Sequence, residues 1–354
     1  MREAFRLCTI FGIKVELHIS FLLLMLFFAI LNPKVFFYLL LLFFFVFLHE
    51  LSHSIVAMRY DVKIDKITLW PIGGVASMER IPKDPNQELK IALAGPSLNL
   101  LVALAILIPL WLAGGLSGLF PFSQIAFAPD PVSIAVIILK VNLLLGAFNL
   151  FVPALPMDGG RIFRALLAMR IGFSKATDVA AMVAKGIAVL MFLAGFYFNI
   201  ILMLISVFIY LGATQESQAT LVSGLLSGVK VRDAMNPQTV TVSRDTSLED
   251  LRSLVLKVKH TGYPVMEDGV PVGIIYLSDM EKVQRGEWPL WKVERAMSRN
   301  VPVCSPEEEA LEVLLRMHSK GVGLMPVMEG GQLVGVISHT DIYRMIEIMR
   351  YLKG

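Results

Sequence analysis

The chain has 354 residues, of which 56% are hydrophobic and 17% are charged, and its mean hydropathy is +0.68. This composition excludes an ordinary soluble globular protein and is typical of a protein with several membrane spans. The net charge of +3 is too small to indicate a nucleic-acid partner. The two cysteines, Cys8 and Cys304, lie far apart in regions of different character, so they predict neither a disulfide framework nor a cysteine-type metal site.

Six apolar segments in the first 215 residues are long enough, or nearly so, to cross a bilayer with some tilt. They cover residues 17–31, 35–59, 88–112, 132–154, 178–197 and 200–215. The basic N-terminus before the first segment resembles a signal peptide, but no small-residue cleavage site follows it. We therefore expect a retained first span and a polytopic, all-α membrane domain over residues 1–220.

The basic residues predict the orientation of these spans. Lysine and arginine are frequent before residue 17, in 60–87, in 161–177 and after 215, whereas the loop 113–131 has none. Because basic loops stay in the cytoplasm, both termini are predicted to be cytoplasmic, on the inner side of the cell membrane. Lys140 lies inside the fourth segment, and we expect its side chain to extend towards the interface; the alternative is that it lines a polar cavity.

His49, Glu50 and His53 form the pattern His-Glu-x-x-His at the end of the second apolar segment. A spacing of four residues places both imidazoles on one face of a helix, where they can bind one zinc ion. The Glu between them is placed to take a proton from a water at the metal. A solvent-facing helix end is the structural alternative, but ionisable residues inside a membrane are costly and are therefore candidates for function.

A catalytic zinc site needs three protein ligands and one open position. Asp158 is the candidate third ligand, because it follows the fourth segment at a membrane depth similar to that of His49. Pro153 and Pro156 interrupt that segment, and two glycines after Asp158 leave the backbone free to bend. Broken helix at membrane depth is tolerated where it lines a cavity. Taken alone, the segment is also compatible with a simple turn before the basic stretch 161–164.

After a short linker at 221–228 the charge density rises, and the chain repeats with a period of 62 residues. The matched pairs are Met235 and Met297, Pro264 and Pro326, Gly273 and Gly335, and Asp279 and Asp341. Each copy has an amphipathic helix (247–260 and 308–320), two short strands joined by a turn, and a second helix. Two such copies, over 229–285 and 291–350, are expected to bury their sheet faces against each other.

These motifs resemble the site-2 protease family of intramembrane zinc metalloproteases, in the branch that carries a C-terminal pair of cystathionine-beta-synthase (CBS) repeats. The matching positions are His49, Glu50 and His53; Asn149, Pro153, Asp158 and Gly159; Gly95, Pro96 and Asn99; and Gly73 with Gly74. The resemblance covers nearly the whole chain. It implies about six transmembrane helices, with a short β-loop after the second, followed by an α+β tandem CBS pair.

The resemblance also implies the catalytic roles. His49, His53 and Asp158 would hold one zinc ion per chain, which would lower the pKa of a water and polarise the scissile carbonyl. Glu50 would accept the proton of that water and later pass it to the leaving amine.

Four further residues have expected roles with open alternatives. Asn149 or Asn99 would hydrogen-bond the developing oxyanion, although helix–helix bonding is at least as good an interpretation of a buried Asn. The loop that contains Gly73 and Gly74 would present a strand edge that holds the substrate extended. The alternative for this loop is an ordinary interfacial segment.

In the C-terminal half the resemblance implies an adenine nucleotide in the cleft between the CBS copies. The pattern that ends each copy, a Ser or Thr three residues before an Asp, stands at Ser338 and Asp341 in the second copy. The first copy departs from it, with Tyr276 before Asp279, so we do not expect two equal sites. A purely structural dimerisation module is the alternative.

The expected function is hydrolysis of peptide bonds within or near transmembrane segments of membrane-protein substrates, that is, regulated intramembrane proteolysis. The cytoplasmic CBS repeats would sense a nucleotide or form a homodimer. A membrane transporter or channel gated by CBS repeats is the main alternative, but it has no need of Glu50 between two histidines, and the spans show no internal repeat. A receptor that retains zinc without catalysis is a further alternative.

Overall fold

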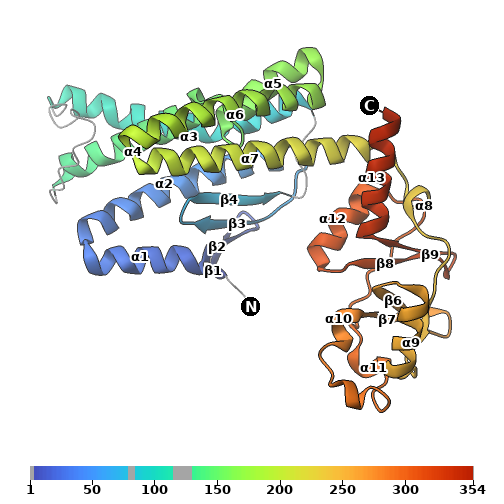
Figure 1. The fold of residues 1–354 in the computed structure, drawn as a ribbon. Coiled ribbons are helices and arrows are strands. Elements are labelled where there is room, and N and C mark those ends of the chain that lie inside the picture. Colours follow the sequence, from blue (N-terminus) through green and yellow to red (C-terminus); the bar gives the residue numbers. More distant parts are fainter. Residues whose placement is uncertain (1–3, 79–83, 115–129, 354) are drawn as a thin grey trace. The chain divides into compact units, whose positions relative to one another are not determined.

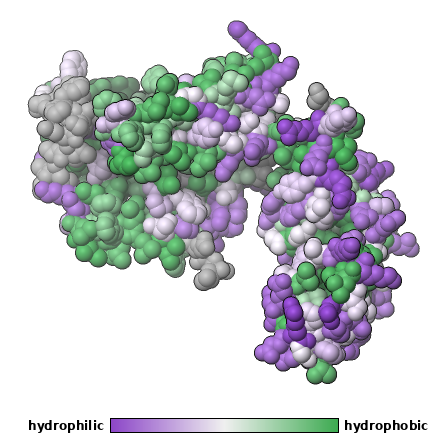
Figure 2. Space-filling model, viewed as in Figure 1, coloured by the Kyte–Doolittle hydropathy of each residue, from purple (hydrophilic) through white to green (hydrophobic). Residues whose placement is uncertain are grey.

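The computed structural model describes residues 4–78, 84–114 and 130–353 (Figure 1). The chain separates into two compact units, Met1–Thr220 and Leu221–Gly354. The first unit contains long apolar helices and one sheet, and the second contains the two copies of the repeat. Hydrophobic residues cover much of the visible face of the first unit, whereas hydrophilic residues dominate that of the second (Figure 2).

Five helices of the described residues are long and apolar enough to cross a membrane. They are α2 (Pro33–Met58), α3 (Pro85–Leu112), α4 (Pro131–Phe151), α6 (Phe173–Phe198) and α7 (Ile200–Leu225). The first apolar segment forms α1 (Ile19–Leu31), whose 13 residues extend over only about 20 Å, less than the roughly 30 Å of a bilayer core. The described chain therefore has one helix of spanning length fewer than expected.

The first turns of three spans share one local design. Asn32, Asp84 and Asp130 are the N-cap residues of α2, α3 and α4, and each is followed by a proline at the first helical position. Each side chain accepts a hydrogen bond from a backbone N–H of its own first turn, and proline lacks the N–H that would remain without a partner there. These Asx-Pro pairs define where the helices begin.

The ends of two helices differ from the predicted segments. α4 ends at Phe151, before Pro153, and Asp158 begins a separate helix, α5 (Asp158–Ile171). α7 continues to Leu225, ten residues beyond the predicted end, because no proline interrupts the residues that follow the apolar stretch. Hydropathy locates the lipid-facing part of a helix, whereas helix propensity decides how far the helix extends.

One mixed sheet packs against α2. Its strands, in spatial order, are β1 (Ala4–Ile10), β2 (Ile13–His18), β3 (Ile64–Trp70) and β4 (Gly73–Met78), with β2 and β3 parallel and the other pairs antiparallel. Ile13 and Ile67 on one face are buried against Leu51 of α2. The sequence analysis expected only a β-loop after α2. The period-two alternation of buried Ile13 and Val15 with charged residues was the missed signal for the N-terminal strands.

Two glycines allow α5 to approach the end of α4. A Cβ at Gly159 would lie 2.8 Å from the backbone carbonyl oxygen of Leu150, and one at Gly160 would lie 2.8 Å from that of Ala154. Both glycines are helical and neither has a positive φ, so close packing rather than free bending requires them. This contact fixes the start of α5, and with it Asp158, against the backbone that follows α4.

The second unit repeats its elements with the period of 62 residues found in the sequence. The first copy has α8 (Val231–Ala234), β5 (Val242–Ser243), α9 (Leu248–Val258), β6 (Gly262–Glu267), β7 (Val270–Tyr276) and α10 (Leu277–Met280), followed by a short 3-10 turn (Arg285–Glu287). The second has α11 (Val293–Ala296), α12 (Ala310–Lys320), β8 (Leu324–Glu329), β9 (Gln332–Ser338) and α13 (His339–Lys353).

The two copies are interlocked. Val231 of α8 packs in the core of the second copy, with Ala310 and Ile337, whereas Val293 of α11 packs in the core of the first. The sheets also meet through a small apolar cluster that includes Ile274. Each copy therefore completes the hydrophobic core of the other, an exchange that the repeat pattern alone did not reveal.

Candidate metal centre

Three buried side chains from two helices converge in the first unit. His49 and His53 lie one turn apart on α2, and Asp158 is the first residue of α5. Asp158 Oδ2 lies 3.0 Å from His49 Nε2 and 3.1 Å from His53 Nε2, and the two imidazole nitrogens are 3.0 Å apart. Within the part of the chain that the structure describes, no other group of three or more His, Cys, Asp or Glu side chains is arranged to share a metal ion.

The second ring nitrogen of each histidine is engaged in a hydrogen bond. His49 Nδ1 donates to Asn99 Oδ1 and His53 Nδ1 donates to the backbone carbonyl of Ile91, both at 2.6 Å. A carbonyl oxygen can only accept, so Nδ1 carries the proton in each neutral ring. Both Nε2 lone pairs are therefore directed towards the carboxylate of Asp158.

This donor set fits zinc. Two imidazole nitrogens and one carboxylate oxygen are ordinary zinc ligands, and tetrahedral ligands of one zinc lie about 3.3 Å from each other. The observed separations of 3.0 and 3.1 Å are close to that value. Three acceptors that face each other in a buried site repel unless positive charge lies between them. Gly95 of α3 leaves the necessary space, because a Cβ there would lie 2.6 Å from His49 Nε2.

The turn of α3 before Pro96 forms the wall behind these histidines. Proline within a helix interrupts the backbone hydrogen bonds of the preceding turn. In that turn, the carbonyl of Ile91 accepts from His53 Nδ1, and the carbonyl of Ala94 accepts from Ser52 Oγ at 3.0 Å. Two carbonyls of this turn thus fix the orientation of α2 side chains at the metal centre.

Glu50 lies beside strand β4. Its side chain is half-buried, and a Cβ at Gly74 would lie 2.6 Å from Glu50 Cγ and 3.4 Å from a methyl carbon of Leu69. Gly74 therefore allows the strand to approach this carboxylate. Gly73, the first residue of β4, has a φ of +152°, which favours glycine.

Comparison with known proteins agrees with this arrangement. The model of peptidase family M50 matches residues 37–193, and the CBS domain model matches residues 231–286 and 293–348. Zinc metalloprotease MJ0392 of Methanocaldococcus jannaschii is 40% identical over 355 residues, which cover 99% of this chain and 98% of that protein. The chain belongs to peptidase family M50, the site-2 protease family.

The predictions of a zinc metalloprotease and of two CBS repeats are thereby confirmed. The solved structure of the site-2 protease from Methanocaldococcus jannaschii is also similar, with 44% identity, a TM-score of 0.45, and coverage of 60% of this chain and 95% of that one. The apolar helices, together with this family, identify a membrane protein. The alternative of a transporter or channel is not favoured.

The two asparagines with expected oxyanion roles have other partners in this M50 protease. Asn99 is completely buried behind His49, and its Nδ2 donates to Asn142 Oδ1 at 2.8 Å, so both ends of its amide are engaged. Asn149 Nδ2 donates to the carbonyl of Leu145 on its own helix at 3.0 Å. Asn99 therefore contacts a metal-centre histidine from behind rather than facing a substrate.

Two other ionisable residues of the membrane unit occupy defined environments. His18 is the N-cap of α1, and its ring stacks on Trp70 of β3 with a centroid separation of 3.6 Å. Lys140 of α4 is only 5% exposed, so its side chain is enclosed by the unit instead of extending to the interface as expected. Neither residue belongs to the metal cluster.

Sequence analysis missed a buried cluster of charges in the same unit. Arg164 of α5 is completely buried, and it donates from Nε to Glu88 Oε1 of α3 at 2.9 Å and from a second nitrogen to the same carboxylate. A third nitrogen donates to Glu216 Oε1 of α7 at 2.6 Å. The basic residues of 161–177 were used only to predict the orientation of the spans, and spacing alone could not pair residues 76 and 52 positions apart.

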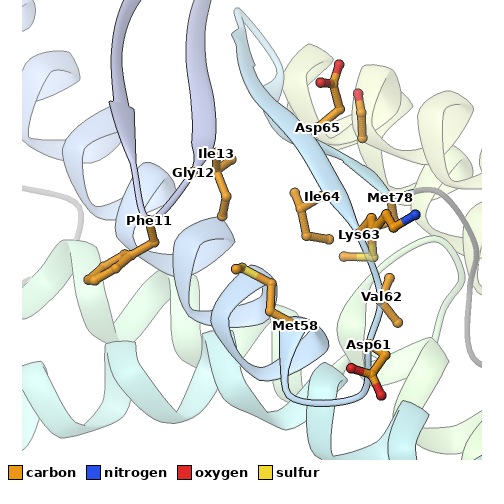
Figure 3. Close-up of a pocket in the computed structure, with 11 residues that line it drawn as sticks. Phe11, Gly12, Ile13, Met58, Asp61, Val62, Lys63, Ile64, Asp65 and Met78 are labelled. Carbon is orange, nitrogen blue, oxygen red and sulfur yellow. The ribbon is translucent and has the colours of Figure 1, made fainter.

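An open cavity of about 840 Å³ lies at the C-terminal end of α2, beyond His53 (Figure 3). The β1–β2 turn at Phe11, the helix end at Met58 and the start of β3 at Ile64 line it, together with charged residues such as Asp65. None of the three metal-centre side chains lines this cavity. It is therefore separate from the candidate catalytic centre.

In the second CBS copy, Ser338 and Asp341 form a helix cap. The backbone N–H and the hydroxyl of Ser338 both donate to Asp341 Oδ2, at 2.9 and 2.5 Å, at the start of α13. In the first copy, Asp279 accepts from the N–H of Tyr276 at 3.0 Å and from Lys282 Nζ at 2.7 Å. Both carboxylates thus stabilise local helix starts in the structure.

Tyr276, the residue that departs from the repeat pattern, bridges the two copies. Its hydroxyl accepts from the N–H of Gly323 at 3.0 Å, and its ring lies against Gly262, where a Cβ would approach to 2.9 Å. Burial raises the pKa of the Tyr276 hydroxyl above its ordinary value. The tyrosine therefore fills space in the first copy that a serine or threonine would leave open.

Proposed function

We propose that this protein is an intramembrane protease that hydrolyses peptide bonds within or near transmembrane segments of membrane proteins. The observation that carries the proposal is the convergence of three buried ligand atoms next to Glu50, two of them on α2, a helix long enough to cross a bilayer. His49, His53 and Asp158 would hold one zinc ion, and the fit of their donor atoms supports that assignment.

Bound zinc supplies a Lewis acid that polarises the scissile carbonyl and makes water acidic. Glu50 accepts a proton from the attacking water and then donates it to the leaving amine. Asn99 holds His49, and the carbonyl of Ile91 holds His53, so neither imidazole needs to reorient during the reaction.

The sheet edge beside Glu50 suits an extended substrate. β4 is the outer strand of its sheet, and Gly74 brings it against Glu50. Ile72 and Val75 of this hairpin are exposed, at 79% and 55%, which matches the apolar side chains of a transmembrane segment. A substrate that unwinds to pair with β4 would be held extended beside the general base.

We also propose that both termini lie on the cytoplasmic side. β2 leads into α1 and β3 follows α2. Because these two strands pair directly, the chain before α1 and the chain after α2 lie on the same side of the membrane, whatever the length of α1. Four helices of spanning length follow among the described residues, an even number. The lysines and arginines between 60 and 87 indicate that the sheet lies on the cytoplasmic side.

For the CBS repeats we propose binding of one adenine nucleotide on the side of Ser338 and Asp341. Tyr276 occupies the corresponding place in the first copy, which supports a single site over two equal ones. Calorimetric titration of the full-length protein with ATP and AMP tests this. Heat from binding that Asp341→Ala abolishes supports the site, whereas no heat supports the alternative of a homodimerisation module.

Metal analysis and cleavage of a model membrane protein, carried out together, test the proposed protease. Glu50→Gln should retain zinc and reduce cleavage by about a hundred- to ten-thousandfold, because only the proton transfer is removed. Asp158→Ala should lower bound zinc. Cleavage by Glu50→Gln at the wild-type rate would exclude the role of Glu50, and full zinc occupancy in Asp158→Ala would exclude that of Asp158.

A further inference from the structure

A chain of buried amides extends behind the candidate metal centre. His49 Nδ1 donates to Asn99 Oδ1 at 2.6 Å, and Asn99 Nδ2 donates to Asn142 Oδ1 at 2.8 Å. Asn142 Nδ2 in turn donates to the backbone carbonyl of Ile138 at 2.9 Å. Both asparagines are completely buried, and they connect α2, α3 and α4.

The last member of this chain determines the direction of every bond before it. The carbonyl of Ile138 can only accept, so Asn142 must present its NH₂ group there and its oxygen to Asn99. Asn99 must then donate with its NH₂ group and present its own oxygen to His49. That oxygen requires a proton on His49 Nδ1, which leaves the lone pair on Nε2.

His53 does not depend on such a chain. Its Nδ1 donates directly to the backbone carbonyl of Ile91, which no side-chain substitution removes. The orientation of His49, by contrast, rests on two side chains that could each rotate by half a turn. If the Asn99 amide reversed, its NH₂ group would face His49 Nδ1 and would stabilise the tautomer with the proton on Nε2, aimed at the metal position.

We propose that Asn142 is a positioning residue of the metal centre, which acts through Asn99 to hold His49 in its metal-binding tautomer. The proposal rests on the zinc-binding role proposed for His49. Partners of this kind, one step behind a metal ligand, commonly change metal affinity by about 10–100-fold. Asn142 lies one step further away, and its effect passes entirely through the orientation of one amide.

The first experiment measures the zinc dissociation constant of the purified full-length protein by competition with a chelator. Asn142→Leu should weaken zinc binding by about 10–100-fold, because Asn99 loses its oriented acceptor. Asn142→Asp should stay close to wild type, because a carboxyl oxygen still accepts from Asn99. Thr177→Val is the matched control: Thr177 is also completely buried and bonds a carbonyl of its own helix, but it does not belong to the chain.

A double-mutant cycle separates positioning from general packing. In the Asn99→Asp background a carboxylate accepts from His49 Nδ1 whichever oxygen faces it, so the tautomer no longer depends on Asn142. Asn142→Leu should then cost less than about threefold in zinc affinity. An equal cost in both backgrounds would overturn the proposal, because the effect would then come from packing.

Nitrogen-15 NMR of the metal-free, histidine-labelled protein provides a readout that is independent of zinc. The His49 signal, identified by its loss in His49→Gln, should report the Nδ1–H tautomer in wild type and mainly the Nε2–H tautomer in Asn142→Leu, because an affinity loss of about 10–100-fold requires the competent tautomer to fall to about 1–10%. An unchanged tautomer would overturn the inference. His53→Ala distinguishes the two proposals. If both His53→Ala and Asn142→Leu leave zinc affinity unchanged, the proposed zinc site itself is wrong. If His53→Ala loses zinc affinity and Asn142→Leu does not, only the positioning role is contradicted.

Discussion

The membrane unit and the CBS unit place their polar residues in opposite ways. Among the described residues, every buried polar or charged side chain except Asp279 lies in the membrane unit. That unit instead exposes large apolar side chains, such as Phe196 and Leu190 of α6, whereas hydrophilic residues cover much of the visible face of the CBS unit (Figure 2). The two units of one chain are thus built for two different solvents.

A buried polar residue has a different meaning in each unit. In the CBS unit, apolar burial away from water stabilises two interlocked cores. In the membrane unit, lipid is as apolar as the interior, so burial of apolar area contributes little and packing and hydrogen bonds hold the helices together. A polar group there is costly unless it has a partner, and the His49–Asn99–Asn142 chain and the Arg164 cluster satisfy that demand.

Removal of an ion pair should show the largest difference in stability between the two units. Arg164→Met removes the counter-charge that hydrogen-bonds the buried carboxylate of Glu88 and the partly buried carboxylate of Glu216, and should lower the free energy of unfolding by about 3–5 kcal/mol. Arg252→Met breaks an exposed ion pair with Glu249 and should cost at most about 1 kcal/mol. Reversible unfolding of the full-length protein in detergent measures both, and similar costs would contradict the contrast.

Truncation of an apolar side chain should cost more stability in the CBS unit than on the exposed face of the membrane unit. Met317→Ala, in the core of the second CBS copy, should destabilise that unit by about 2–5 kcal/mol. Leu190→Ala, on the exposed face of α6, should change the stability of the membrane unit by less than about 0.5 kcal/mol. Pulse proteolysis of the full-length protein, with mass spectrometry of the fragments, follows both units in one sample. A large loss for Leu190→Ala would show that this face packs against protein.

The space at the metal centre can be tested with a single methyl group. Gly95→Ala places a carbon against both imidazoles and should weaken zinc binding by about 10–100-fold. Gly186→Ala on α6 is the control, because a Cβ at that position meets no atom within 4 Å. Chelator competition measures both variants. Unchanged affinity in Gly95→Ala would mean that α3 can move away without loss.

The two thiols provide the mildest test. Burial raises the pKa of the Cys304 thiol to about 12, so very little thiolate is present at pH 8. Cys8 is exposed on β1. Alkylation at pH 8 should therefore label one thiol in the native protein and two after unfolding, as counted by mass spectrometry. The pKa of the Cys304 thiol is higher in the folded protein than in the unfolded chain. The buried thiol therefore contributes fully to stability below the pKa of the unfolded chain, and this contribution is lost as the pH rises towards 12. Native labelling of Cys304 at the rate of Cys8 would contradict its burial.

Several features could be derived from the sequence because they depend on local spacing. The four-residue interval between His49 and His53 places both rings on one side of any α-helix, whatever surrounds it. The 62-residue period likewise predicted two equivalent copies, and continuous hydropathy predicted α2, α3, α4, α6 and α7 as spans. The family resemblance could also be recognised from the sequence, because its motifs are short and contiguous.

Contacts between distant segments could be decided only by the tertiary structure. Nothing in the spacing pairs Asn99 with Asn142, Arg164 with Glu88, or Gly74 with Glu50. The exchange of α8 and α11 between the CBS cores, and the pairing of β2 with β3 across two helices, are of the same kind. Local patterns determine which element a residue belongs to, because backbone geometry is periodic. Which side chain satisfies a buried donor depends on how those elements pack, and that depends on the whole chain at once.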